Sequence, residues 1–324
     1  MTMSLENPFR ITGVERIRFA VQDFAEACRY ATDWGLVPAA PLDPNGCVFT
    51  AVDGSEIEIV ACDPTRPDRT PLGGGRSGVC EITWGVADEA SIGRLANELR
   101  KDRPAERDAQ NVLHSRDDLG IGMAFGPARR RSVPFETTKF NAPGHAARVN
   151  RRAVRYERAT PHEISHVAIG VPHAGEASAF YIERLGFIVS DCYAKRGVFL
   201  RCSPRGNHHH LFLLNGQGDG ARFNHLAFKV RDVHEVIGGG QAFEHRGWKT
   251  FAGPGRHVVS SACFWYFQSP FGGAWEYAAD EDIVTEHWET TDFSATAHIF
   301  SEWTFGLEKS DGRLRGPISQ SVER

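Results

Sequence analysis

The sequence predicts an α+β fold of four βαβββ units, arranged as two modules that are each a cupped mixed sheet with outer helices. Three observations support this prediction. Strand-like and helix-like patterns alternate along the second half, the same order of patterns occurs twice there, and a fainter copy occupies the first half. A length of 324 residues agrees with two domains of ordinary size.

The unit that begins near residue 163 has the clearest pattern. Residues 164–171 (ISHVAIGV) alternate and are rich in β-branched side chains, so they predict a strand. Residues 174–185 have helical spacing and stop before Gly186, a residue suited to a helix C-cap. Three short β-rich runs complete the unit, at residues 187–192, 197–202 and 208–214.

The same order then repeats. The next unit has a strand at residues 223–230, a helix at 233–245 and further strands within 257–268 and 274–278. The first half carries related segments: residues 15–21 resemble 163–169, 30–37 resemble 181–188, 79–88 resemble 223–232, and 125–128 resemble 271–274. This self-similarity indicates an internal duplication with two units in each half.

These repeats give the expected domain organisation. We expect an N-terminal module at residues 1–135, a basic connector at 136–160, a C-terminal module at 161–290, and a cap with a polar tail at 291–324.

Composition excludes several classes of function. Lys and Arg number 37 against 41 Asp and Glu, so no overall charge attracts nucleic acid, and the arginines of the connector are interpreted as a solvated surface. The sequence contains no apolar run of 18 residues, so it predicts no membrane span. The N-terminus lacks a signal pattern, and we therefore expect a cytoplasmic protein. The seven cysteines are odd in number and form no CxxC pair, which favours reduced thiols over disulfides or a zinc site.

Three residues at matching places in the repeats predict a metal site. His166 and His225 lie on the first strands of consecutive units, and Glu276 lies on the last strand. Duplicated units bring equivalent strand positions together, and two imidazoles with one carboxylate form the facial triad typical of non-heme Fe(II) enzymes. The alanines at 274 and 278 share a strand face with Glu276, which leaves room for a ligand.

With these residues in place, the second half resembles the type I extradiol ring-cleaving dioxygenases of the vicinal oxygen chelate (glyoxalase/bleomycin-resistance) superfamily. The resemblance rests on the triad, on a histidine-rich strand about fifteen residues before His225, and on the run from His257 through Tyr266 to Phe271-Gly272-Gly273 and Glu276. The motif agreement is confined to about residues 162–280, whereas the two-module organisation covers nearly the whole chain.

The resemblance implies a set of roles. His166, His225 and Glu276 would bind Fe(II), with Mn(II) as an alternative, and the enzyme would open a catechol-type ring with O₂ beside its two hydroxyls. His210 would be the acid–base residue, while Tyr266 and His257 would hydrogen-bond the substrate oxygens. The protein would form a homo-oligomer, with no nucleic-acid or membrane partner.

Strand parity leaves a choice among three consecutive histidines. His208 and His210 share one face of a regular strand, and His209 takes the other. His210 is preferred because it lies fifteen residues before His225.

The N-terminal module departs from the ligand pattern. Arg18 aligns with His166, Glu81 with His225, and Arg130 falls near the place of Glu276. Two arginines cannot serve as ligands, so this module is expected to be metal-free, as it is in the family.

Three alternatives stay open at this point. A hydroquinone-cleaving dioxygenase would use the same metal with hydroxyls in a para arrangement. A glyoxalase-like isomerase of the same superfamily would use a metal with different acid–base residues. A non-catalytic ligand-sequestering module would need no triad.

Overall fold

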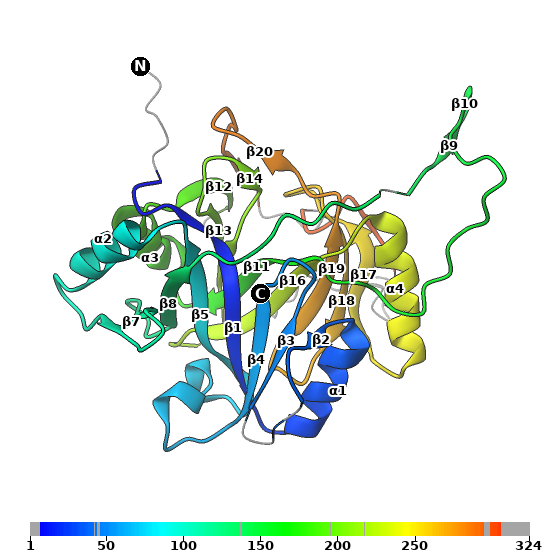
Figure 1. Ribbon diagram of the computed structural model, residues 1–324. Coiled ribbons are helices and arrows are strands. Elements are labelled where there is room, and N and C mark those ends of the chain that lie inside the picture. The colour runs from blue at the N-terminus through cyan, green and yellow to red at the C-terminus, as the bar shows by residue number, and fades with distance from the viewer. Residues whose placement is uncertain are drawn as a thin grey trace.

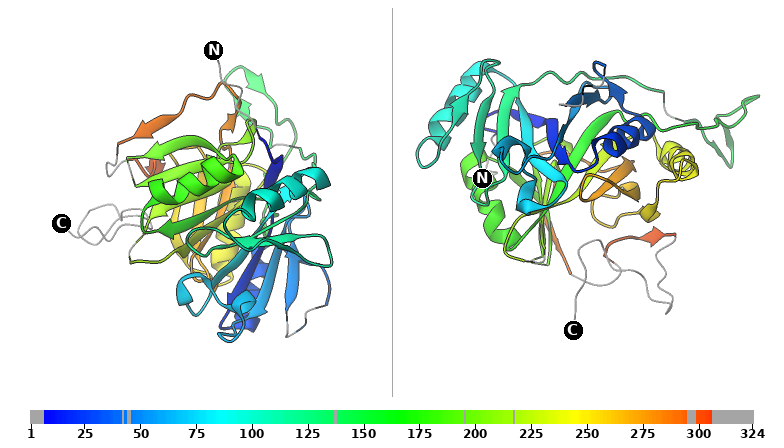
Figure 2. Two further views of the ribbon diagram at one scale, coloured as in Figure 1. Left: turned by 90° about the vertical axis from the view of Figure 1, so that its left-hand side faces the viewer. Right: turned by 90° about the horizontal axis from the view of Figure 1, so that it is seen from below.

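The computed structural model describes residues 7–41, 43, 46–136, 138–194, 196–216, 218–294 and 299–305. It contains one large sheet for each module, with helices on the outer faces (Figures 1 and 2). The predicted α+β fold of duplicated βαβββ units is confirmed. The polar tail after Gly306 lies outside the described residues.

The N-terminal sheet is built from two units. Its strands are Ile11–Val21 (β1), Val37–Pro38 (β2), Cys47–Thr50 (β3), Glu56–Ala61 (β4), Gly78–Val86 (β5), Glu106–Arg107 (β6), Leu113–Arg116 (β7) and Gly122–Pro127 (β8). Helix α1 (Phe24–Trp34) follows β1, and α2 (Glu89–Leu99) follows β5; two short 3₁₀ turns, Pro67–Arg69 and Leu72–Gly74, lie before β5. The strand order is β2-β3-β4-β1-β5-β8-β7-β6, so β1 and β5 meet at the centre.

The C-terminal sheet repeats this plan. Its strands are Glu163–Val171 (β11), Ile188–Tyr193 (β12), Gly197–Arg201 (β13), Leu211–Asn215 (β15), Arg222–Lys229 (β16), Thr250–Arg256 (β17), Cys263–Gln268 (β18), Ala274–Ala279 (β19), Thr291–Phe293 (β21) and Trp303–Thr304 (β22). The order is β21-β12-β13-β15-β11-β16-β19-β18-β17-β22. Helix α3 (Ala174–Ala179) continues into a π-helical turn, Phe180–Arg184, and α4 (Val233–His245) follows β16.

Two small two-stranded sheets lie outside the two large sheets. Gly206–Asn207 (β14) pairs with Ile283–Val284 (β20), and the connector contains a hairpin of Asn141–Ala142 (β9) and His145–Ala146 (β10) that projects from the body (Figure 1). The strands β21 and β22, which follow the fourth unit, extend the two edges of the C-terminal sheet. The region expected to be a cap therefore contributes edge strands.

Local capping explains where the helices begin and end. The side chains of Asp23, Asp88 and Asp232 accept hydrogen bonds from backbone N–H groups in the first turns of α1, α2 and α4. Helix α1 ends at Gly35, whose φ of 107° requires glycine. A Cβ at Gly35 would lie 2.1 Å from the carbonyl oxygen of Ala159, so the end of the connector crosses closely over this helix end.

The two modules share one hydrophobic core. Trp34, at the end of α1, stacks on Tyr277 of β19 with ring centroids 3.7 Å apart, and the Tyr277 hydroxyl donates to the Trp34 carbonyl at 2.8 Å. Tyr30 of α1 contacts Phe243 of α4 edge to face, so these helices lie side by side (Figure 2). The N-terminal module is thereby packed on the sheet that carries the predicted ligands.

A second contact joins the modules at the opposite end of the fold. Arg184, at the end of the α3 segment, donates to Glu98 of α2 at 2.7 Å, and the buried Tyr181 hydroxyl donates to Asp117 at 2.9 Å. The modules therefore contact each other at both ends of the fold. In the described ranges, no helix is long and apolar enough to cross a membrane.

Trp34→Ala tests the shared core. Truncating a fully buried tryptophan should lower the free energy of unfolding by about 3–5 kcal/mol, since it removes apolar burial and leaves a cavity. Urea unfolding followed by fluorescence and circular dichroism measures this loss, and both probes should still report one transition. Phe305→Ala, at a side chain that is 66% exposed, is the control and should change stability little. Separate transitions for the two modules would contradict a common core.

An ion network on the N-terminal sheet predicts a pH dependence of stability. Glu81 accepts from His114 Nδ1 at 2.8 Å, and this hydrogen bond raises the His114 pKa to about 9. The contribution of this pair should be complete below the unfolded histidine pKa of about 6.5 and lost as pH rises through 9. The difference in unfolding free energy between wild type and His114→Gln should therefore shrink over that window. His145→Gln, at an exposed position, is the control; a difference independent of pH would contradict the assignment.

Candidate metal centre

His166, His225 and Glu276 converge on one point in the C-terminal sheet. They come from β11, β16 and β19, which are consecutive in the strand order. The two Nε2 atoms are 3.1 Å apart, and Oε2 of Glu276 lies 3.6 Å from His166 Nε2 and 3.7 Å from His225 Nε2. All three side chains are buried. The structure therefore brings together the three residues that the repeat pattern selected.

Strand register explains the convergence. Ala168 pairs with His225 across β11 and β16, while Ala227 pairs with Glu276 across β16 and β19. Each of these ligand-type residues thus has a small neighbour directly opposite on the next strand. Side chains at paired positions share a sheet face, so the alanines leave the space into which the larger side chains lean.

Burial dominates the electrostatics of the three residues. It raises the pKa of Glu276, and it lowers the pKa of His166 far below the usual range and that of His225 to about 3. The imidazoles are therefore neutral near pH 7, which is the form that binds metals.

Neither carboxylate oxygen of Glu276 has a hydrogen-bond partner among the described residues, although the side chain is fully buried. Such an orphaned carboxylate is costly unless a cation compensates it. One carboxylate and two neutral imidazoles, with donor atoms within 4.8 Å of one another, are the donor set expected for a divalent ion of the iron or manganese type. The residues present therefore fit the metal that the sequence predicted.

His257 and Tyr266 lie beside this cluster. His257 Nδ1 donates to the Phe300 carbonyl at 2.8 Å, so in the neutral ring Nε2 accepts from the Tyr266 hydroxyl at 2.9 Å. Oε1 of Glu276 is 3.5 Å from His257 Nε2, and the Tyr266 ring packs edge to face on His225. His257 lies in the loop between β17 and β18, whereas the sequence pattern placed it on a strand.

The parity argument for the three consecutive histidines was wrong. It held that His210 shares a face with His208 and that His209 points away. The structure turns His209 toward the cluster, where its ring packs against His166 with centroids 3.9 Å apart and planes tilted by 36°, while His208 bonds Asp191 at 2.7 Å. The physical reason is that β15 begins only at Leu211, so residues 208–210 lie in irregular backbone where alternation does not apply.

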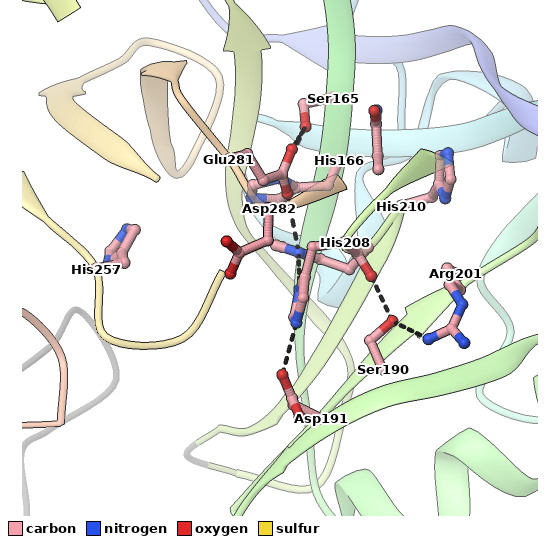
Figure 3. A network of polar contacts seen from close by, with 12 residues as sticks. Ser165, His166, Ser190, Asp191, Arg201, His208, His210, His257, Glu281 and Asp282 are labelled. Atoms are coloured by element: carbon pink, nitrogen blue, oxygen red, sulfur yellow. Dashed lines mark hydrogen bonds and ion pairs between the residues drawn. The ribbon is translucent and has the colours of Figure 1, made fainter. Parts of the chain in front are cut away.

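His210 points into a different region, between the modules. It accepts from the Cys202 backbone N–H through Nδ1 at 3.4 Å and lines a cavity of about 790 Å³ together with Glu15, Arg130 and Glu163. The structure does not bring His210 to the three ligand-type residues, and no dashed line joins it to the polar network in Figure 3.

Glu281 is a site residue that the sequence did not reveal. Its Oε1 lies 3.4 Å from His209 Nδ1, and its Oε2 accepts from Ser165 and faces the Lys229 ammonium, both at 3.2 Å. The donor atoms of Glu281, His166 and His209 are also close enough for a metal, but the adjacent Lys229 charge opposes a cation there. Glu281 follows the end of β19, so no strand periodicity marked it.

Strand register also corrects the alignment of the N-terminal module. Val21 is the last residue of β1 and pairs with Ala61, and Val171 is the last residue of β11 and pairs with Asn215, so Val21 and Val171 are equivalent. Counted back from these two residues, Arg16 rather than Arg18 occupies the place of His166. Glu81 pairs with Gly122 as His225 pairs with Ala274. The place of Glu276 therefore falls to Ala124, and Arg130 lies beyond the strand, where it binds Asp53 and Glu163. The sequence alignment of the two halves was displaced because short apolar motifs match at several offsets.

Comparison with known proteins agrees with this geometry. The family model described as Glyoxalase/Bleomycin resistance protein/Dioxygenase superfamily matches residues 163–277. The chain is 32% identical over 185 residues to metapyrocatechase 2 of Cupriavidus necator, a match that covers 56% of this chain and 57% of that protein. The matched region is thus little more than half the length of this relative.

Solved structures match over nearly the whole chain. The Mn(II)-bound glyoxalase from Novosphingobium aromaticivorans superposes with a TM-score of 0.74 at 20% identity, over 97% of this chain and 95% of that one. Homoprotocatechuate 2,3-dioxygenase from Arthrobacter globiformis gives a TM-score of 0.70 at 18% identity, over 94% and 90%. At such identities these likenesses establish the fold, including its two-module plan. The family model matches the part of the C-terminal module, residues 163–277, that carries His166, His225 and Glu276.

Proposed function

We propose that this protein is an extradiol dioxygenase, which cleaves a catechol-type aromatic diol with O₂ at a mononuclear Fe(II) held by His166, His225 and Glu276. The observation that carries the proposal is the buried carboxylate of Glu276, which has no hydrogen bond and faces two neutral imidazoles. The metapyrocatechase relative supports the same reaction class.

A bound divalent ion would supply a Lewis acid that makes the diol easier to deprotonate. The protein would accept the proton through Tyr266 and His257. The Tyr266 hydroxyl donates to His257 Nε2, so the tyrosine oxygen can accept a hydrogen bond from a substrate hydroxyl while its own proton moves toward the imidazole. The carbonyl of Phe300 holds the other side of the His257 ring.

Aromatic side chains around this pair suit a planar ring. Phe264 stacks on His257 with centroids 4.0 Å apart, and Phe300 packs edge to face on both rings at 5.0–5.2 Å. Among the described residues at the metal cluster, no arginine contacts His257, Tyr266 or Glu276. We therefore favour a diol whose ring substituents are largely apolar.

His209 takes the acid–base role that the sequence assigned to His210. Its ring is buried against His166 and Phe199, next to the ligand-type residues. Binding both reactants beside one imidazole places the proton donor and acceptor within reach of each other.

We also propose that the protein forms a homo-oligomer, which sedimentation velocity would establish.

One specific observation favours a second candidate. The Mn(II)-bound glyoxalase superposes with a TM-score of 0.74, so a metal-dependent isomerase built on the same ligands is the runner-up, with Mn(II) in place of Fe(II). A hydroquinone-cleaving dioxygenase would share the Fe(II) and differ in the spacing of the substrate hydroxyls. Incubating the Fe(II) and Mn(II) forms with catechols, hydroquinones and a glutathione hemithioacetal separates the three.

Metal binding should depend on Glu276. Glu276→Gln replaces the orphaned carboxylate by a neutral amide of the same size, so the variant should lose most of its affinity for Fe(II) and Mn(II). In wild type a metal at 100 times its dissociation constant should stabilise the fold by about 2.7 kcal/mol, visible as a rise in Tm. His210→Asn is the matched control and should keep that rise. Equal metal-induced shifts in wild type and Glu276→Gln would contradict the site.

Activity should depend on His209 and not on His210. His209→Asn should lower kcat for the best diol by about 10²–10⁴-fold, the usual contribution of a general acid–base group. His210→Asn should stay within a few-fold of wild type, because its imidazole faces the cavity between the modules. O₂ uptake and product absorbance under anaerobic Fe(II) loading measure both. A large loss in His210→Asn with normal His209→Asn would reverse the assignment.

A further inference from the structure

We infer that Asp191 and His208 form a positioning pair, which fixes the tautomer and the orientation of the His209 imidazole beside the metal ligands. The inference rests on the proposed function only in giving His209 a role in catalysis. The pair itself is defined by hydrogen bonds within the protein.

Three buried side chains form one continuous row. Oδ2 of Asp191 is 2.7 Å from His208 Nε2, and Nδ1 of His208 is 3.0 Å from His209 Nδ1. Asp191, His208 and His209 are 1%, 0% and 3% exposed, so water does not compete for these hydrogen bonds. At the far end of the row, the His209 ring packs against the His166 ring.

With Asp191 ionised and both imidazoles neutral, the row has one consistent assignment of protons. An ionised carboxylate can only accept, so His208 Nε2 carries a hydrogen and His208 Nδ1, in the neutral ring, is an acceptor. His209 Nδ1 must then carry a hydrogen to complete the second bond. Oε1 of Glu281 lies 3.4 Å from the same Nδ1, and this negatively charged oxygen favours a hydrogen there. His209 Nε2 is left with its lone pair, and no described residue hydrogen-bonds it.

The surroundings hold the row in place. Ser190 donates from Oγ to the His208 carbonyl, and Arg201 donates to Ser190 Oγ at 2.9 Å (Figure 3). The other oxygen of Asp191, Oδ1, accepts from the Thr291 backbone N–H at 2.7 Å, where β12 pairs with β21. The two Asp191 oxygens therefore bind different partners: Oδ1 accepts from the edge strand β21, and Oδ2 accepts from His208.

This arrangement explains why the irregular backbone at 208–210 is useful. A regular strand would place adjacent histidines on opposite faces, whereas here His208 and His209 bond to each other through their Nδ1 atoms. An imidazole that must accept a proton needs its lone pair aimed at the reactant, and a carboxylate–imidazole partner supplies that orientation.

The test uses Asp191→Asn and His208→Gln in the full-length protein. Asparagine keeps an oxygen for the Thr291 N–H but cannot accept at both atoms, so the tautomer preference of His208 should be lost. Metal content and KM should stay at wild-type values, while kcat falls about 10–100-fold, the usual effect of removing such a supporting partner. The double variant should lose no more than the worse single one. Asp292→Asn, an acid on the paired strand β21 that bonds Ala194 N instead, is the matched control and should leave kcat unchanged.

A second readout needs neither metal nor turnover. Long-range ¹H–¹⁵N spectra of metal-free, ¹⁵N-histidine-labelled protein report each tautomer, with His208 expected as Nε2–H and His209 as Nδ1–H. Asp191→Asn should shift the His209 signals toward a mixture, and Asp292→Asn should not. His209 in the same tautomer in wild type and Asp191→Asn, or an unchanged kcat in an active enzyme, would overturn the inference. If His208 is found as Nε2–H and His209 as Nδ1–H but the protein turns over no diol, the proposed reaction is refuted and the positioning pair is supported.

Discussion

The site depends on one physical constraint: a carboxylate, Glu276, is held without a hydrogen bond in the fully buried centre of a sheet. Removing such a charge from water is costly, and burial raises the pKa of Glu276 although His257 and Tyr266 act in the opposite direction. Two neutral imidazoles at 3.6 and 3.7 Å cannot neutralise it, but together they complete a donor set for a divalent cation. The hydrophobic core that surrounds the sheet keeps the three donor side chains in place.

The duplicated fold shows that the scaffold does not decide the chemistry. Both sheets bring equivalent strand positions together, yet the N-terminal sheet has Arg16, Glu81 and Ala124 at those positions. There Glu81 is compensated by His114 and faces Arg18, so its charge is satisfied within the protein. Among the described residues, Glu276 has both carboxylate oxygens buried without a hydrogen bond, and this difference is why we propose metal chemistry for the C-terminal half.

Much of the fold could be predicted from the sequence because it is repeated. Alternation on β11 and β16 and the helical spacing of residues 174–185 are local signals, and their recurrence reinforced them. The convergence of His166, His225 and Glu276 could be predicted for the same reason, since equivalent positions in duplicated units lie close together. The alignment of Arg18 and Arg130 failed because short apolar motifs match at several offsets, and only hydrogen-bonded pairing fixes register.

By itself, the sequence determined the duplicated units, the three ligand-type residues and the aromatic and histidine residues near them, because periodicity and spacing are properties of the chain. Tertiary structure alone decided which of three adjacent histidines faces His166, His225 and Glu276. Residues 208–210 lie before β15, where no alternation constrains them, and Asp191, His166 and Cys202 each bind a different imidazole. These partners are distant in sequence, and their contacts exist only after the sheet and the two modules have assembled.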